Sequence, residues 1–276
     1  MKKQLWISLA VLLSFSVFAE KHNNTAETPD LGPLQPGMVP DFAAEYDVYY
    51  GDYHLGAGRY ELERTGLETY QFRFASKMRF LLFFSDKRWL KTDFSFRENQ
   101  IIPHYFWHKR RGTGKEYTDE ITFDAKAKHI KSVHKEALFD LDYDAMVKDG
   151  LSVQLQLMLD LRRGLKQPSY KIIEQGSIDE RQFAFTGEDT IEIEGIEYQC
   201  VVYEIVRDNK NRSTQMWFSP QHNYQPLMMA HYSKKEKKFN ARLKYFKVND
   251  DKAEGLMSIA VDEHEEMETI NLEEDA

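Results

Sequence analysis

The feature of this sequence that most constrains its fold is an alternation of apolar and polar residues that begins at Phe42. In the first run, Tyr46, Val48 and Tyr50 alternate with polar neighbours. The same two-residue period returns in later runs, at 70–74, 89–97, 101–110, 117–123, 198–206 and 243–248. Short clusters of Gly, Asn, Asp and Glu separate these runs. Such alternation is typical of antiparallel strands, and we expect on the order of a dozen of them.

One segment, residues 150–163, departs from the two-residue period. Five of its side chains recur at helical spacing: Leu151, Leu155, Met158, Leu159 and Arg162. Asp149 is placed to accept hydrogen bonds from the first turn, and Gly164 can adopt the left-handed conformation that ends a helix. We expect one amphipathic helix of about four turns, packed on a large curved antiparallel sheet or partly closed barrel. The fold class is therefore mainly β.

Glycines interrupt the strand-like run at Gly56-Ala57-Gly58. Glycine weakens a strand, so its presence there suggests a bend or the close approach of another element. A bend helps a large sheet to curl, which favours the partly closed barrel over a flat sheet.

The N-terminal sequence MKKQLWISLAVLLSFSVFAE has the pattern of a secretory signal peptide. Two lysines precede a short apolar core, and small residues at Val17 and Ala19 place the cleavage after Ala19. The apolar core is shorter than the ~20 residues of a membrane span, so we expect no transmembrane segment. We therefore expect export to a bacterial periplasm.

The rest of the chain divides by composition into three parts. Residues 20–41 contain four prolines and form a linker, and residues 42–249 form the β-rich domain. Residues 250–276 hold 11 acidic residues and one lysine without sustained periodicity, which indicates an acidic disordered tail. The formal charges of residues 20–249, the linker and the β-rich domain together, balance, so we expect no nucleic-acid partner. The one cysteine, Cys200, cannot form a disulfide within the chain, and we expect it to be buried.

The stretch MWFSPQHNYQP, residues 216–226, raises the question of an active site. Pro220 cannot continue a strand ladder, and Gln221, His222 and Asn223 are turn formers. We therefore expect a hairpin corner whose aromatic residues reach the core. His222 is expected to be a solvated turn residue rather than a catalytic one.

This corner, with a strand before and after it, resembles a pattern in the exported bacterial family named domain of unknown function 3108 (DUF3108). The resemblance continues in YDVYYGDYHLGAGRYELER, in IIPHYF and in DGLSVQLQLMLDLRRG, and it covers about residues 42–248. It implies export and a β-rich fold, and it implies no activity. The corner is also distantly similar, at the level of fold, to the outer-membrane lipoprotein carrier proteins of the Lol system, which wrap an incompletely closed sheet around a helical lid.

The sequence offers no catalytic residue, metal site or cofactor motif. His104 and His108 are four residues apart, but in a strand this spacing is about 13 Å, too long for one ion to bridge. Carboxylates and histidines can still converge in the fold, so a carboxylate-dependent hydrolase is an alternative function.

Two features suggest binding. The apolar segment MRFLLFF, residues 78–84, is either a strand covered on both faces or part of an apolar cleft. The candidate lining residues of that cleft are Phe80, Phe83, Trp89, Leu155 and Trp217. A basic segment, KKEKKFNARLK, is either a solvated hairpin or a contact for anionic head groups or for the acidic tail, through Lys234, Lys235, Lys237 and Lys238.

The prediction is thus a non-catalytic periplasmic protein that binds an apolar, lipid-like ligand or an envelope partner. An envelope assembly scaffold acting through protein contacts is a further alternative. The sequence does not predict the oligomeric state.

Overall fold

The computed structural model describes residues 40–80, 84–207, 209, 211–234 and 236–248. The predicted signal peptide, nearly all of the predicted linker and the predicted acidic tail lie outside the described residues. Within them, no helix is long and apolar enough to span a membrane.

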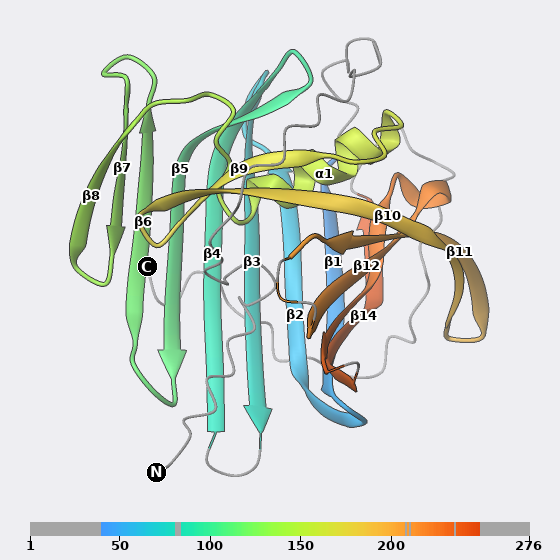
Figure 1. Cartoon of the computed structure of the whole chain (residues 1–276). Coiled ribbons are helices and arrows are strands. Elements are labelled where there is room, and N and C mark those ends of the chain that lie inside the picture. The colour runs from blue at the N-terminus through green and yellow to red at the C-terminus, as the bar shows by residue number, and fades with distance from the viewer. Residues whose placement is uncertain (1–39, 81–83, 208, 210, 235, 249–276) are drawn as a thin grey trace.

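Fourteen strands and one α-helix make up the described part of the chain, so the predicted mainly β fold with a single helix is confirmed (Figure 1). Before the helix lie β1 (Phe42–Tyr50), β2 (Tyr53–Arg64), β3 (Thr69–Phe80), β4 (Phe84–Arg97), β5 (Gln100–Gly112), β6 (Tyr117–Asp124), β7 (His129–His134) and β8 (Ala137–Asp142). After α1 (Ser152–Arg162) follow β9 (Ser169–Glu174), β10 (Ser177–Ile193), β11 (Ile196–Ile205), β12 (Arg212–Ser219), β13 (Gln225–Ser233) and β14 (Glu236–Val248).

All strands belong to one antiparallel sheet whose order follows the chain in two arms. The order is β8-β7-β6-β5-β4-β3-β2-β1-β14-β13-β12-β11-β10-β9. The first arm consists of β1 to β8 and the second arm of β9 to β14. They meet where β1 pairs with β14, with Phe42 opposite Val248 and Tyr50 opposite Phe239. Strands β8 and β9 therefore form the two ends of the sheet, and the segment with α1 connects them.

The sheet curls so that α1 lies inside it, with β10 crossing in front of the strands of the first arm (Figure 1). Leu151, just before the helix, and Leu155 and Leu159 within it join the large core cluster, which contains residues of both arms. Val153, Leu157 and Leu161 instead join a second cluster with residues of β9 to β12. The predicted single apolar stripe is thus one of two, and the helix is buried on both sides.

The two residues predicted to flank the helix, Asp149 and Gly164, make the expected contacts at its ends. The Asp149 carboxylate accepts hydrogen bonds from the backbone N–H groups of Leu151 at 2.8 Å and Ser152 at 3.0 Å. Gly164 has a φ of 89°, and its N–H group bonds the Leu161 carbonyl at 2.9 Å. The helix has three turns rather than four, because its regular part is limited to 11 residues.

A buried glutamine fixes the helix against the turn between β4 and β5. The side chain of Gln156 accepts from the Ile101 N–H group at 2.8 Å and donates to the Asn99 carbonyl at 3.0 Å. It also donates to the Asp160 carboxylate at 3.1 Å. Gln156 is fully buried, so its amide group has these hydrogen bonds in place of bonds to water.

The corner at residues 216–226 is a hairpin, as predicted, in which a short 3-10 helix (Pro220–His222) joins β12 to β13. Trp217 and Phe218 are buried and anchor the corner. The prediction that His222 is solvated is wrong, since only 8 % of it is exposed. Its Nδ1 lies 2.7 Å from the Ser219 hydroxyl, and this hydrogen bond across the turn turns the ring inward.

Two further expectations concern small residues. Cys200 is buried and free, as predicted. Gly56 lies at an irregularity in the pairing of β1 with β2 and has a φ of 145°. A Cβ atom at Gly56 would lie 2.1 Å from the Lys77 carbonyl oxygen, so only glycine lets β3 approach there.

Candidate ligand-binding site

An apolar cleft lies between α1 and the inner face of the sheet, where the two arms meet. Aromatic side chains of β1 and β3 form one wall, among them Phe42, Phe72 and Phe74. Val153 and Leu157 of the helix and Phe218 of β12 contribute to the other walls. The space open to the centres of water molecules in this cavity is about 60 Å³. One water molecule needs roughly 10–15 Å³ on that measure, so the cleft has room for several small groups.

Four methionines line this cleft: Met158, Met216, Met228 and Met229. Met158 comes from α1, Met216 from β12, and the other two from β13. Thioether side chains are unbranched and polarizable, so they repack around a guest more readily than branched side chains do. The cleft can therefore widen without a change in the backbone.

One polar group in the cleft lacks a partner. The Gln225 amide donates to the Tyr46 hydroxyl at 2.7 Å, and that hydroxyl donates to the Pro226 carbonyl at 2.7 Å. This chain of donors fixes the orientation of the amide and leaves Gln225 Oε1 without a hydrogen-bond partner among the described residues. Gln225 is only 2 % exposed, and burial raises the pKa of Tyr46 well above its ordinary value. The lining residue Gln225 thus carries one buried acceptor without a partner, in apolar surroundings.

The residues predicted from sequence to line an apolar cleft lie elsewhere. Trp89 is half-buried on β4 and alternates with Leu90, which faces the core. Trp217 is buried in the core, where its Nε1 donates to Asp189 at 2.9 Å. Leu155 lines a smaller cleft between α1 and the corner at residues 216–226. Phe83 lies outside the described residues, as does the side chain of Phe80.

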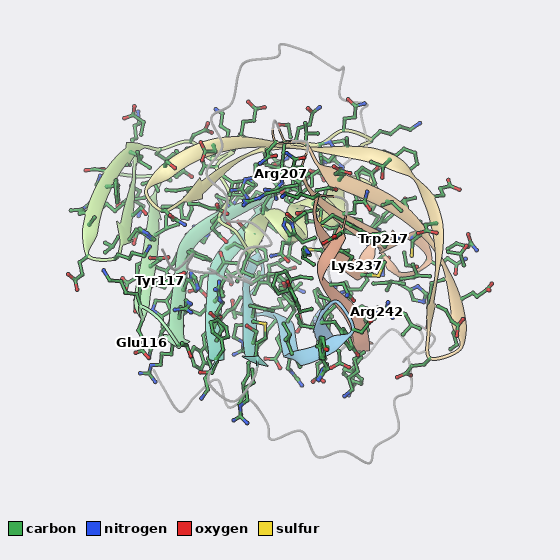
Figure 2. The ribbon with its side chains drawn as sticks, turned by 60° about the horizontal axis from the view of Figure 1, so that its bottom comes forward. Glu116, Tyr117, Arg207, Trp217, Lys237 and Arg242 are labelled. Atoms are coloured by element: carbon green, nitrogen blue, oxygen red, sulfur yellow. The ribbon has the colours of Figure 1, made fainter. Side chains whose placement is uncertain are left out.

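The predicted basic contact lies at the turn between β13 and β14, and Figure 2 places Lys237 among the strands of the second arm. Lys234 and Lys237 are exposed. Lys238 forms an ion pair with Glu236, whereas Lys235 lies outside the described residues.

A second, polar cleft adjoins the apolar one on the side of the first arm. It has a cavity volume of about 80 Å³ on the same measure. Its polar lining comes from β5, β6, β7 and β9: His108, Tyr117, Asp119, Ser132, His134 and Glu174. Three side chains, Tyr60, Phe74 and Gln154, line both clefts and form the wall between them.

Strand register brings two histidines to one carboxylate in the polar cleft. Asp119 lies opposite His108 on β5 and opposite His134 on β7. Its carboxylate is 3.4 Å from Nδ1 of His108 and 2.7 Å from Nδ1 of His134. Burial is the main cause that lowers the pKa of His108, with the nearby Arg88 adding to it. Nε2 of His108 has no hydrogen-bond partner in the described part of the chain.

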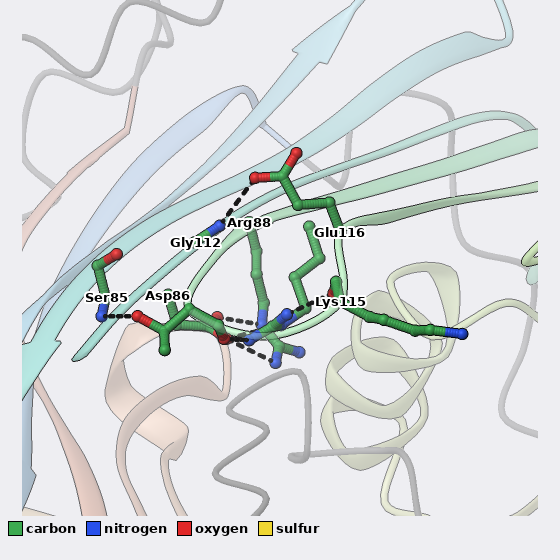
Figure 3. A network of polar contacts seen from close by, with 8 residues as sticks. Ser85, Asp86, Arg88, Gly112, Lys115 and Glu116 are labelled. Atoms are coloured by element: carbon green, nitrogen blue, oxygen red, sulfur yellow. Dashed lines mark hydrogen bonds and ion pairs between the residues drawn. The ribbon is translucent and has the colours of Figure 1, made fainter. Parts of the chain in front are cut away.

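A charged cluster continues from this cleft along the inner face of β4 and β5. The Asp86 carboxylate accepts from Nε of Arg88 at 2.6 Å and from Nε of Arg110 at 2.8 Å (Figure 3). Arg110 also donates to the carbonyls of Lys115 and Thr113, which fixes the turn between β5 and β6. All three charged side chains are buried, so the cluster is internal rather than a surface patch.

Glu174 closes the polar cleft from β9. Its carboxylate is 2.5 Å from Nη2 of Arg181. Burial nevertheless raises the pKa of Glu174 to about 7. The residue can therefore change charge near neutral pH.

Sequence reasoning missed the members of both clefts. In each of β5, β6 and β7 a polar residue of the cleft lies two positions from a core residue and so on the same face, as His108 does relative to Phe106. That alternation is the signal by which an inward-facing position could have been found. In the part of the chain that the structure describes, no group of three or more His, Cys, Asp and Glu side chains is arranged to hold a metal ion.

Comparison with known proteins supports the fold and the family. A solved structure titled as a beta-barrel-like protein of domain of unknown function DUF1849 from Brucella abortus is 12% identical, with a TM-score of 0.52. The match covers 77% of this chain and 99% of that one, and at such low identity it shows the fold alone. No curated protein matches the sequence. The family described as "Protein of unknown function (DUF3108)" matches residues 45–242, and the chain therefore belongs to that family.

Proposed function

We propose that this protein is non-catalytic and binds an apolar, lipid-like ligand in the cleft between α1 and the curled sheet. The observation that carries the proposal is the lining of that cleft, which is aromatic and thioether-rich and contains one unpartnered acceptor, Gln225 Oε1. Ligand sites are typically concave and mostly apolar, with a few polar groups that orient the ligand. A cleft of this composition matches that description.

The position of the cleft also supports binding rather than simple core packing. It lies between the two core clusters, where α1 meets strands of both arms. The methionine side chains can move while the aromatic wall of β1 and β3 stays fixed by the sheet. A site with one rigid and one adaptable wall suits chains of variable length.

The first test is the binding of N-phenyl-1-naphthylamine, an uncharged fluorescent dye, to the full chain. In the variant Met229→Trp the indole fills the cleft, so we expect dye affinity to fall at least tenfold. Met146→Trp is the matched control, because Met146 is exposed and lines none of these clefts. Equal dye binding by both variants would show that the dye does not enter this cleft.

Native mass spectrometry identifies the natural ligand. Protein purified from its own cell envelope should carry an extra mass that Met229→Trp protein lacks. The bare chain in both samples, together with no dye binding, would overturn the proposed function.

We further propose that the protein acts after export to the periplasm, with its N-terminus at Glu20. The support is the signal-peptide pattern of the sequence. N-terminal sequencing of the protein from a periplasmic fraction tests both the compartment and the cleavage site.

A hydrolase is the second candidate, and the pairing of Asp119 with two imidazoles favours it. A carboxylate that orients His Nδ1 leaves Nε2 free to act as a base, as in His–Asp dyads. Hydrolysis of p-nitrophenyl octanoate that disappears in His108→Phe would support this candidate over simple binding.

The basic turn at Lys234 and Lys237 supports an assembly role as the third candidate, because exposed cations there can contact an acidic partner. Crosslinking in cells tests it. A partner that crosslinks to the full chain but not to a chain lacking residues 250–276 indicates a tail-dependent contact. A partner lost in a Lys234→Glu, Lys237→Glu variant indicates the basic turn.

A further inference from the structure

The apolar and polar clefts share a wall. Tyr60 of β2, Phe74 of β3 and Gln154 of α1 line both of them. A hydrogen bond joins the Tyr60 and Gln154 side chains, and the Gln154 amide also donates to the Gly150 carbonyl at 3.0 Å. A molecule that extends past this wall would have one end among methionines and the other among imidazoles and carboxylates.

The polar cleft offers a buried acceptor that nothing in the described chain uses. Because Nδ1–H of neutral His108 donates to the Asp119 carboxylate, Nε2 is the unprotonated nitrogen and carries a lone pair. His108 is only 6 % exposed, and a buried acceptor without a partner costs free energy. A group that donates a hydrogen bond there removes this cost.

The charges around the cleft indicate which donor fits. Asp119 and Glu174 face it directly, so a phosphate or sulfate would meet negative charge. Arg88 and Arg110 bind Asp86 and do not line this cleft. A hydroxyl group can donate to an imidazole and also accept from the Tyr117 or Ser132 hydroxyl that lines the cleft, whereas an ammonium group can only donate.

We propose that the two clefts form one site for an amphipathic molecule with an uncharged, hydroxyl-bearing head. The chain lies in the methionine-lined cleft, and the head lies against His108 and Asp119, past the Tyr60–Gln154 wall. This inference rests on the proposed function and adds the chemical class of the head group. A glycerol head and a sugar head share that chemistry.

The test compares amphiphiles with the same eight-carbon chain and different heads. Octyl glucoside, 1-monooctanoylglycerol, octylamine and octyl sulfate displace the naphthylamine dye from the full chain, each below its micelle-forming concentration. We expect the two hydroxyl-bearing compounds to displace the dye at concentrations at least tenfold lower than octyl sulfate or octylamine does. Whichever of these two compounds displaces the dye at the lower concentration shows whether a sugar or a glycerol head fits better.

Variants locate the head. His108→Phe keeps a planar ring but removes the acceptor, and Asp119→Asn removes the charge that orients the His108 ring. Both variants should reduce the preference for hydroxyl-bearing heads over octyl sulfate to less than threefold. His54→Ala is the control, because His54 is exposed on β2 and pairs with Asp47. The ¹⁵N shift of His108 Nε2 in the unmodified protein should change with octyl glucoside, and this readout does not depend on a variant that folds.

The outcomes separate this inference from the proposed function. Dye displacement with no head-group preference and no change at His108 Nε2 would overturn the head-group site and leave the apolar cleft intact. Absence of dye binding, together with recovery of the bare chain from the cell envelope, would overturn both. Cleavage of 1-monooctanoylglycerol that depends on His108 would replace the binding site with an active site.

Discussion

Replacing Gln156 by leucine tests how the helix is held inside the sheet. Leucine has nearly the volume of glutamine, so no cavity forms, but it can neither accept nor donate a hydrogen bond. The Ile101 N–H group and the Asn99 carbonyl would each lose the partner that Gln156 provides. A buried group left without its partner costs about 1–3 kcal/mol.

The expected loss follows from these contacts. The Ile101 amide is fully buried and contributes about 2 kcal/mol, and the half-buried Asn99 carbonyl contributes about 1 kcal/mol. Asp160 also loses a donor, but it keeps the Tyr170 hydroxyl at 2.8 Å and Arg163 at 3.1 Å, so that loss is small. We expect Gln156→Leu to lower the free energy of unfolding by about 3 kcal/mol.

Urea unfolding followed by tryptophan fluorescence measures this change. With an m value of about 3 kcal/mol per molar, the midpoint should fall by about 1 M urea at an unchanged m value. Gln199→Leu is the matched control, since Gln199 is exposed on β11 and should change stability by less than about 0.5 kcal/mol. Faster hydrogen exchange at the Ile101 amide should accompany the loss. A midpoint for Gln156→Leu equal to that of the control would refute the reasoning.

Three other predictions address backbone packing, charge and thiol accessibility. Gly56→Ala should lower the free energy of unfolding by about 3 kcal/mol in thermal or urea melts, because its Cβ atom would collide with a carbonyl of β3. A change below about 0.5 kcal/mol would contradict the close approach. Burial raises the pKa of Glu174 from 4.5 to about 7, so the folded state binds this proton more tightly than the unfolded state does. The stability that the bound proton contributes is therefore lost as the pH rises through about 7. Relative to Glu174→Gln, the unmodified protein should lose about 2–3 kcal/mol of unfolding free energy between pH 5 and pH 8, whereas the exposed Glu197→Gln should show no such difference. Burial raises the pKa of Cys200 to about 11, so aromatic disulfide reagents should label it only at the rate of unfolding, and rapid labelling of folded protein would contradict its position.

Much of this architecture could be predicted because local and global signals agree. Alternation marks the strands, and Asp149 and Gly164 mark the ends of the helix through their own hydrogen bonds. The corner at residues 216–226 is set by Pro220, which cannot donate to a ladder. None of these features depends on knowing which distant segments meet.

Features that depend on distant contacts could not be predicted. Asp86 and Arg88 look like solvent-facing residues of a charged strand, but they are buried because Arg110, on the next strand, completes their cluster. The second helix stripe, which includes Val153 and Leu157, was hidden because β9 to β12 cover it only after the chain returns. The polar cleft needs three strands in register before Asp119 meets both imidazoles.

The two unjoined ends of the sheet have a mechanical consequence. A closed barrel has a bore fixed by its strand number and stagger, because hydrogen bonds run around the full circumference. Here β8 and β9 do not pair with each other. On the outer edge of β9, the backbone of Lys148 provides partners instead. Its N–H group donates to the Lys171 carbonyl and its carbonyl accepts from the Ile173 N–H group, both at 2.9 Å. The curled sheet can therefore change its curvature around its contents without breaking hydrogen bonds between neighbouring strands.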